Sequence, residues 1–147
     1  MLATGASRVA AGMYDIHTPA RVFQNVEGQA IHGFDAVAYF IDQRPVHGLP
    51  AFKTKWNGAV WQFASLANRT AFESNPYAFA PRYGGYCAFG LADQKRLFPS
   101  NPNRWSIVSG QLYLNFDEHT RASWVATPGP LVSAGDAAWA ALAPTLS

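Results

Sequence analysis

Alternating apolar and polar residues on both sides of an Asn-Gly pair form the clearest pattern in this chain. Residues 52–56 (FKTKW) lead through Asn57 and Gly58 into residues 59–63 (AVWQF). An Asn-Gly pair between two such runs favours a type I′ turn, whose twist matches that of paired strands. The pattern therefore predicts an antiparallel hairpin over residues 52–63.

A second hairpin is predicted further along the chain, where a Ser-Gly pair separates two more strand-like runs. Residues 105–108 (WSIV) form the first run and residues 111–116 (QLYLNF) the second. Successive side chains of a strand point to opposite faces. The two leucines and Phe116 therefore share one face, and Tyr113 and Asn115 lie on the other.

A helix is predicted between the two hairpins. Ser65 can cap its first turn, and the helix would run over residues 66–74. Its apolar side chains, Ala67, Ala71 and Phe72, would then be buried. An Asn-Pro pair follows and would end the helix, because the residue before proline avoids helical angles.

Two further helices are predicted after the second hairpin. Asp117 can cap one that runs to about Val125. The Pro-Gly-Pro run at residues 128–130 is expected to break the chain. Ser133 would then start a last alanine-rich helix that reaches about Ala143.

The first part of the chain is less regular. Residues 1–20 are predicted to be a flexible leader, and residues 22–26 a short strand. Residues 31–40 (IHGFDAVAYF) are typical of a turn that leads into an apolar strand. Short hairpins mixed with short helices indicate one small α+β domain over residues 21–147, with antiparallel hairpins packed against helices. We find no internal repeat.

Composition argues against some partners. Charged residues make up 14% of the chain, the net charge is +2, and no run of Lys or Arg occurs. Nucleic-acid binding needs a concentrated basic face, so we expect no nucleic-acid partner. No stretch approaches the ~20 apolar residues of a membrane span. We expect a soluble protein, either cytoplasmic or exported with its signal peptide absent from this chain.

The only cysteine, Cys87, ends the block Tyr83-Gly84-Gly85-Tyr86-Cys87. One cysteine excludes an internal disulfide and an all-cysteine metal cage within one chain. If a helix began at the glycines, Cys87 would lie in its first turn, where amide hydrogens and the helix dipole favour a thiolate. The other interpretation is a small apolar residue packed in the core, and spacing alone favours it.

No standard catalytic or cofactor motif is present, and the four histidines show no ligand-like spacing. His32, beside a glycine, is the histidine that we would first pair with Cys87, as a catalytic base. With Asp35, the same pair could hold a single copper(I) ion. We prefer the interpretation that Asp35 is a buried carboxylate that caps nearby amides. Copper is the only cofactor that these residues suggest.

Four tyrosines lie in apolar surroundings. They are Tyr39, Tyr83, Tyr86 and Tyr113. A buried phenol needs a hydrogen-bond partner, and Asp35 and Asn115 are the partners that we expect. Such a network could line a ligand pocket or only lock the core, and the structural role is favoured.

Four sequence blocks, in their order and spacing, resemble the YHS-domain family. They are residues 33–40 (GFDAVAYF), residues 56–58 (WNG) with 63–65 (FAS), residues 83–88 (YGGYCA) and residues 112–116 (LYLNF). The likeness spans about residues 30–140. It implies a small α+β domain, in a group whose biochemical role is mostly undefined and which often occurs as single-domain exported proteins in bacteria.

Related YHS and TRASH-like domains carry metal-binding cysteines that this chain lacks. Laid on this sequence, those cysteines fall at Ala38, Ala64 and Asn68, none of which supplies a thiolate. A structural zinc site generally needs four ligands, so the metal cage of that branch is missing. The chain resembles instead the single-cysteine branch, in which Cys87 lies in the glycine-tyrosine block.

Three functional hypotheses remain. The leading one is a non-enzymatic binding or accessory module with a pocket near Cys87, Asp35 and Tyr39, for a small ligand or weakly bound copper. The second is a thiol-dependent enzyme or redox sensor that uses Cys87. The third is an oligomerising or partner-binding protein that uses its aromatic surface.

Overall fold

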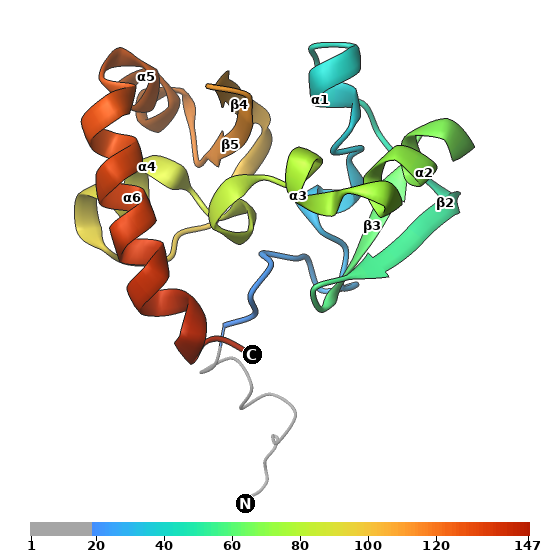
Figure 1. Cartoon of the computed structure of the whole chain (residues 1–147), viewed down its shortest axis with the longest axis horizontal. Coiled ribbons are helices and arrows are strands. Elements are labelled where there is room, and N and C mark those ends of the chain that lie inside the picture. The colour runs from blue at the N-terminus through green and yellow to red at the C-terminus, as the bar shows by residue number, and fades with distance from the viewer. Residues whose placement is uncertain (1–18) are drawn as a thin grey trace, which may run out of the picture.

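Two β-hairpins, each with its own helices, make up the fold (Figure 1). The computed structural model describes residues 19–147. The described elements are η2 (Ile31–Gly33), α1 (Ala38–Ile41), β2 (Leu49–Trp56), β3 (Ala59–Phe63), α2 (Leu66–Ser74), α3 (Pro76–Phe79), η3 (Arg82–Gly85), α4 (Ala88–Gln94), β4 (Asn101–Val108), β5 (Gln111–Asn115), α5 (Glu118–Ala126), α6 (Pro128–Leu142) and η4 (Ala143–Thr145), where η marks a 3₁₀ turn. The expected α+β class is confirmed.

The predicted leader, residues 1–20, lies outside the described residues except for its last two. Pro19 and Ala20 both accept hydrogen bonds from residues later in the chain. The carbonyl of Pro19 accepts from the backbone N–H of Ser147 (3.2 Å), and that of Ala20 accepts from the hydroxyl of Tyr86 (2.7 Å). The start and the end of the described chain therefore lie side by side, as Figure 1 shows.

The first hairpin confirms the prediction from the Asn-Gly pair. β2 pairs with β3 in antiparallel register, and the two turn residues Asn57 and Gly58 both have positive φ, 52° and 80°. Two consecutive positive φ values define the type I′ turn. β4 and β5 form the second predicted hairpin around a Ser-Gly turn, although β4 begins earlier than expected, at Asn101.

Residues 31–40 do not form the predicted strand. They contain η2 and the start of the short helix α1. The carboxylate of Asp35 explains the difference, because its Oδ1 accepts from the backbone N–H groups of Val37 (2.9 Å) and Ala38 (3.2 Å) and so caps a helical turn. Residues 22–26 also form no strand and contribute one isolated bridge.

The helix α2 begins and ends where its caps predict. Ser65 Oγ accepts from the backbone N–H of Asn68 at 3.1 Å. Phe72 is fully buried and Ala71 partly, but Ala67 is exposed, contrary to the prediction. At 3.6 residues per turn, a residue five positions before Phe72 lies well round the helix from it.

The last two helices follow the prediction in part. Asp117 caps α5 as expected, through a capping box with Thr120. The Pro-Gly-Pro run does not break the chain, however, because α6 begins at Pro128. A helix leaves the N–H groups of its first turn unpaired, so prolines fit there.

The second half of the fold repeats the first, 52 positions further along the chain, which corrects the expectation of no internal repeat. β4, β5 and α5 begin and end 52 positions after β2, β3 and α2, and α6 begins 52 positions after α3. The two hairpins also have their register irregularity at the same place, after their first residue pair.

The backbone angles carry the same repeat. Positive φ values occur in pairs at Ile31 and Tyr83, His32 and Gly84, Gly33 and Gly85, Gln43 and Lys95, Asn57 and Ser109, and Gly58 and Gly110. We call residues 31–76 the first unit and residues 83–128 the second unit. Each consists of a left-handed turn, a short helix, a hairpin and a helix with a side-chain cap.

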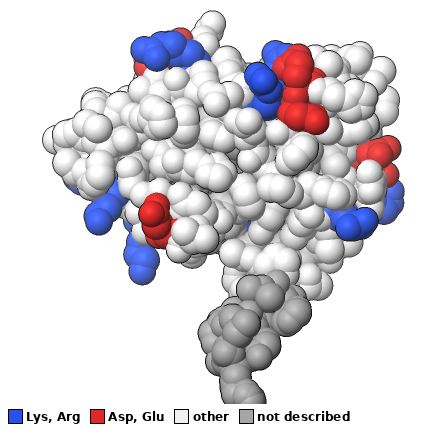
Figure 2. Space-filling model, turned by 180° about the vertical axis from the view of Figure 1, so that it is seen from behind, with Lys and Arg blue, Asp and Glu red and all other residues white. Residues whose placement is uncertain are grey.

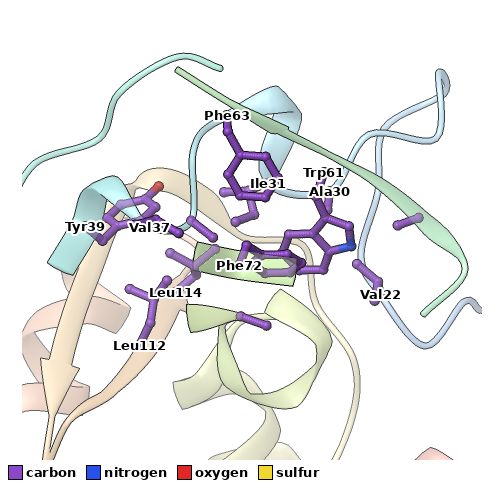
Figure 3. Packing of buried hydrophobic residues seen from close by; sticks show 13 residues of the cluster. Val22, Ala30, Ile31, Val37, Tyr39, Trp61, Phe63, Phe72, Leu112 and Leu114 are labelled. Atoms are coloured by element: carbon purple, nitrogen blue, oxygen red, sulfur yellow. The ribbon is translucent and has the colours of Figure 1, made fainter. Parts of the chain in front are cut away.

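Strand β5 lies between two hydrophobic clusters. Leu112 and Leu114 belong to the cluster around Phe72 of the first unit (Figure 3). Tyr113, on the opposite face, packs in the second cluster with Trp124, their ring centroids 4.9 Å apart. Both faces of β5 are buried, so the prediction that one face is polar and the other apolar does not describe its surroundings.

Charged side chains are sparse on the surface. Figure 2 shows one face on which they lie in small groups separated by uncharged residues. Among residues 19–147, no helix combines the length and the apolar character that a membrane crossing requires.

Candidate functional site

The glycine block forms a left-handed turn and not the start of a helix. Tyr83, Gly84 and Gly85 have φ values of 60°, 63° and 82°. Such angles cannot continue a right-handed helix. α4 therefore begins only at Ala88, and the prediction that Cys87 lies in the first turn of a helix starting at the glycines is wrong. Cys87 is the N-cap residue of α4.

Gly84 and Gly85 let other parts of the chain approach their backbone. The carbonyl of Gly84 accepts from the backbone N–H of Phe23 (2.8 Å), and a Cβ on Gly84 would overlap the carbonyl oxygen of Arg21. The carbonyl of Gly85 accepts from Ser100 Oγ (2.5 Å). Both candidate glycines thus hold neighbouring segments together.

Cys87 is buried but has polar neighbours. Its side chain is 1% exposed, and its Sγ lies 3.5 Å from Asn115 Oδ1 and 3.5 Å from the backbone nitrogen of Gly90. Asn115 is fully buried, and its Oδ1 also accepts from the backbone N–H of Phe89 (2.9 Å). Asn115 Nδ2 has no hydrogen-bond partner among the described residues.

A pocket of about 370 Å³ opens beside Cys87, between α4 and α5. It is lined by Cys87, Phe89, Gly90, Asp93, Gln94, Phe98, Pro99, Phe116, His119 and Thr120. Phe98 packs against Gly90, where a Cβ would collide with its ring. Phe116 was expected on the same strand face as Leu112 and Leu114 but lies just beyond β5 and is 52% exposed.

The histidine at this pocket is His119 and not His32. His32 is exposed, contacts the ring of Phe23 (centroids 5.8 Å apart) and lines a different, open groove. His119 lies in the first turn of α5, two residues after the capping Asp117. Sequence reasoning missed His119 because only tertiary packing brings α5 against α4.

Asp35 has the capping role that we preferred. It is fully buried, and its two oxygens accept four hydrogen bonds. Oδ1 binds the N–H groups of Val37 and Ala38, and Oδ2 binds the N–H of Ala64 and the Nδ2 of Asn68, both at 2.8 Å. Neither Asp35 nor Tyr39 lines the pocket at Cys87, so the structure does not bring these three candidates together there.

The three positions that the YHS resemblance matches to metal-binding cysteines meet at this carboxylate. Ala38 precedes Ala64 and Asn68 by about 30 residues or fewer, yet all three donate a hydrogen bond to Asp35, Ala38 and Ala64 through the backbone N–H and Asn68 through Nδ2. The three positions are therefore close in space.

Cys87 is the counterpart of Asp35 in the second unit. The N–H groups that correspond to those of Val37 and Ala38 belong to Phe89 and Gly90. Phe89 donates to Asn115 Oδ1 and Gly90 to Cys87 Sγ. An amide oxygen and a sulfur thus share the role that one carboxylate oxygen has in the first unit.

The pocket occupies the place in the second unit that corresponds to the surroundings of Asp35 in the first unit. Asp35, Ala38, Ala64 and Asn68 correspond to Cys87, Gly90, Phe116 and Thr120, and all four of the latter line the pocket. Cysteine, glycine and threonine are smaller than their counterparts aspartate, alanine and asparagine. The larger phenylalanine at position 116 is half exposed. The changes from aspartate to cysteine and from asparagine to threonine leave space at the pocket, whereas the ring of Phe98 takes the space beside Gly90.

The tyrosines do not use the partners that we expected. Tyr39 donates to the carbonyl of Pro102 (2.7 Å), and Tyr83 donates to Asp136 Oδ1 (2.9 Å). Tyr86 donates to a backbone carbonyl, and the Tyr113 hydroxyl has no hydrogen-bond partner among the described residues. None therefore bonds to Asp35 or Asn115.

Burial raises the pKa of all four tyrosines. The carboxylate of Asp35 raises the pKa of Tyr39 further, and the hydrogen bond to Asp136 does so for Tyr83. All four hydroxyls therefore remain protonated at neutral pH.

Within residues 19–147, no three His, Cys, Asp or Glu side chains are grouped closely enough to hold a metal ion. Comparison of the chain with protein-family models, curated proteins and solved structures found no match.

Proposed function

We propose that this chain is a YHS-like binding module whose second unit holds a small, largely apolar molecule between α4 and α5. The observation that carries the proposal is the pocket of about 370 Å³ beside Cys87, which has three phenylalanines in its lining. Its volume falls within the range of roughly 300–1,000 Å³ that is common for ligand pockets.

The lining of the pocket suits such a ligand. Phe89, Phe98 and Phe116 supply aromatic surface, and the polar residues come mainly from the exposed sides of α4 and α5. A half-exposed Phe116 at the edge of a pocket leaves apolar area in contact with water, which a ligand would cover. Few other large apolar residues are as exposed in the second unit.

The family part of the proposal is supported by the arrangement around Asp35. The resemblance aligns Ala38, Ala64 and Asn68 with cysteines of one metal site, which requires the three positions to be close in space. Their shared hydrogen-bond acceptor meets that requirement.

A catalytic thiol has less support. A reactive cysteine is normally accessible and paired with a base or another positive group. Cys87 is 1% exposed, and its described hydrogen bonds are to Asn115 and Gly90, not to a histidine. We therefore propose that Cys87 forms part of a binding wall and is not a nucleophile.

Binding of N-phenyl-1-naphthylamine tests the proposal. This neutral dye becomes more fluorescent in apolar surroundings, and we expect saturable binding by the full chain. Replacement Phe116→Gln should weaken binding by about tenfold, equal to about 1.4 kcal/mol, because part of an aromatic wall is lost.

Leu66→Gln is the matched control. Leu66 is 53% exposed, as Phe116 is 52%, but it lies on α2, away from the pocket. It should leave dye affinity unchanged. Equal losses in the two variants, or no saturable binding by the wild type, would show that the pocket is not a binding site.

A cobalt titration tests the family relationship separately. The triple variant Ala38→Cys, Ala64→Cys and Asn68→Cys introduces three thiols at positions whose backbone or side chain contacts Asp35. If the alignment with the metal-binding branch is right, thiolate and carboxylate ligands form a tetrahedral site there. We expect bound Co²⁺ with thiolate charge-transfer absorption in this variant and none in the wild type.

The double variant Ala38→Cys and Ala64→Cys is the control for that titration. It should bind Co²⁺ more weakly, because one of the ligands is missing. If the triple variant absorbs no more than the wild type, the alignment of these positions with the metal-binding branch is wrong.

A further inference from the structure

We infer that the molecule bound beside Cys87 carries a carboxylate, one oxygen of which has the role that Asp35 Oδ2 has in the first unit. The ligand class is then a small carboxylic acid with an apolar body. This inference rests on the proposed function and adds to it the polar group by which the ligand is recognised.

The first unit shows what the backbone at this place binds. One oxygen of Asp35 accepts the two N–H groups at the start of α1. The other accepts from the backbone N–H of Ala64, just after β3, at 2.8 Å, and from Asn68 Nδ2. A carboxylate is thus held between the end of a strand and the start of a helix.

In the second unit only the first half of this arrangement is satisfied internally. Phe89 and Gly90 at the start of α4 donate to Asn115 Oδ1 and Cys87 Sγ. The backbone N–H of Phe116, which corresponds to that of Ala64, donates to no described residue. The cysteine side chain has a single polar atom, Sγ, so Cys87 offers no second acceptor for the N–H of Phe116.

A second unpaired donor lies close by. Asn115 is fully buried beside Cys87, and its Nδ2 has no hydrogen-bond partner among the described residues. A buried N–H without an acceptor costs free energy, and hydrogen bonds to a charged acceptor are stronger than those to a neutral one. The unpaired N–H of Phe116, which lines the pocket, therefore favours a ligand with an anionic oxygen. Asn115 is not in the lining and adds a second unpaired donor next to Cys87.

The rest of the pocket fits the other parts of such a molecule. Phe89, Phe98 and Pro99 offer an apolar wall for its body. Besides Cys87, two ionisable groups line the pocket, His119 from α5 and Asp93 from α4. Both are on the exposed side of their helices, so the negative charge of Asp93 is in contact with solvent.

Isothermal titration calorimetry with phenylacetate tests the inference on the full chain. Phenylacetamide and phenethylamine have a similar apolar body but replace the carboxylate by a neutral or a cationic group. We expect phenylacetate to bind at least about tenfold more tightly than either. In ¹H–¹⁵N spectra, the amide signal of Phe116 should move when phenylacetate is added.

Cys87→Asp and Cys87→Ser form a matched pair of variants. Aspartate at this position would supply the carboxylate from within the chain, as Asp35 does, so Cys87→Asp should lose phenylacetate binding by about tenfold or more. Serine has no carboxylate, so Cys87→Ser should lose much less phenylacetate affinity than Cys87→Asp does. Circular dichroism establishes that both variants are folded, and the comparison of the three ligands does not depend on either variant.

Equal affinity for phenylacetate and phenylacetamide would overturn the inference, and so would a Phe116 amide signal that does not respond. These outcomes are distinct from failure of the proposed function. If the neutral dye binds at the pocket and phenylacetate has no advantage, the binding module stands without a carboxylate ligand. If the dye does not bind, the proposed function itself fails.

Discussion

Replacement of Asp35 by alanine is expected to lower the free energy of unfolding by about 4 kcal/mol. The variant would leave the N–H groups of Val37, Ala38 and Ala64, and the amide of Asn68, without their acceptor. The side chain is fully buried, so water cannot readily replace it. Urea unfolding followed by tryptophan fluorescence measures the loss.

Asp42→Ala is the control for this prediction. Asp42 also lies on the short helix α1, at its C-terminal end, but is exposed. Its replacement should change the free energy of unfolding by less than about 0.5 kcal/mol. A loss below about 1 kcal/mol for Asp35→Ala would mean that Asp35 does not hold the first unit together.

Local chemistry allowed much of the fold to be predicted from the sequence. Asn57 and Gly58 adopt positive φ with little cost, so the first hairpin turn depends on only two residues. Ser65 and Asp117 each bond to an amide three positions away and mark the start of α2 and α5. These predictions are correct because the features depend on local interactions and need no contact between distant residues.

Other features depend on tertiary contacts. The apolar run at residues 31–40 is compatible with a strand, and Asp35 makes it helical only because its carboxylate is buried between segments distant in sequence. The side chains of β5 also alternate between its two faces as predicted, but both faces are buried. Tyr113 and Asn115 are buried because α4 and α5 cover the face that would otherwise be polar.

The internal repeat is not visible as sequence similarity because most side chains differ. Identity at the 52-residue spacing is found mainly at residues with special backbone properties, such as Gly33 and Gly85, or Gly58 and Gly110. Most other pairs, including Asp35 and Cys87, have different chemistry. The two units therefore share their backbone conformation but differ in the side chains at their centres.

The candidate site was therefore only partly predictable. The glycine-tyrosine-cysteine block contains Cys87, which lines a pocket, but His32 and Asp35 do not line that pocket. Both belong to the first unit, and their counterparts in the second unit are Gly84 and Cys87. Alignment of the two units at the 52-residue spacing pairs Asp35 with Cys87. This pairing shows that the second unit lacks the carboxylate.

The comparison of the units also explains why one is closed and the other open. Hydrogen bonds that Asp35 accepts close the first unit and connect α1 to the end of β3 and to α2. The corresponding place in the second unit has no carboxylate and opens into a pocket.

Gly84→Ala is expected to destabilise the protein by about 3 kcal/mol or more. Gly84 has a φ of 63°, which a residue with a Cβ adopts only with strain. The new Cβ would also overlap the carbonyl oxygen of Arg21 and press on Trp139. Because the obstacle is backbone, the N-terminal segment would have to move and lose the hydrogen bond from Phe23. Thermal unfolding by circular dichroism measures the effect.

Gly110→Ala separates the two causes of this loss. Gly110 also has a positive φ, 78°, but no atom lies within 4 Å of the place that a Cβ would take. It should cost only the backbone strain, about 1 kcal/mol, so the excess in Gly84→Ala measures the contact with Arg21. If both alanine variants unfold at the same temperature, the N-terminal segment can move aside without loss. The close approach at Gly84 would then not be what holds the N-terminal segment on the second unit.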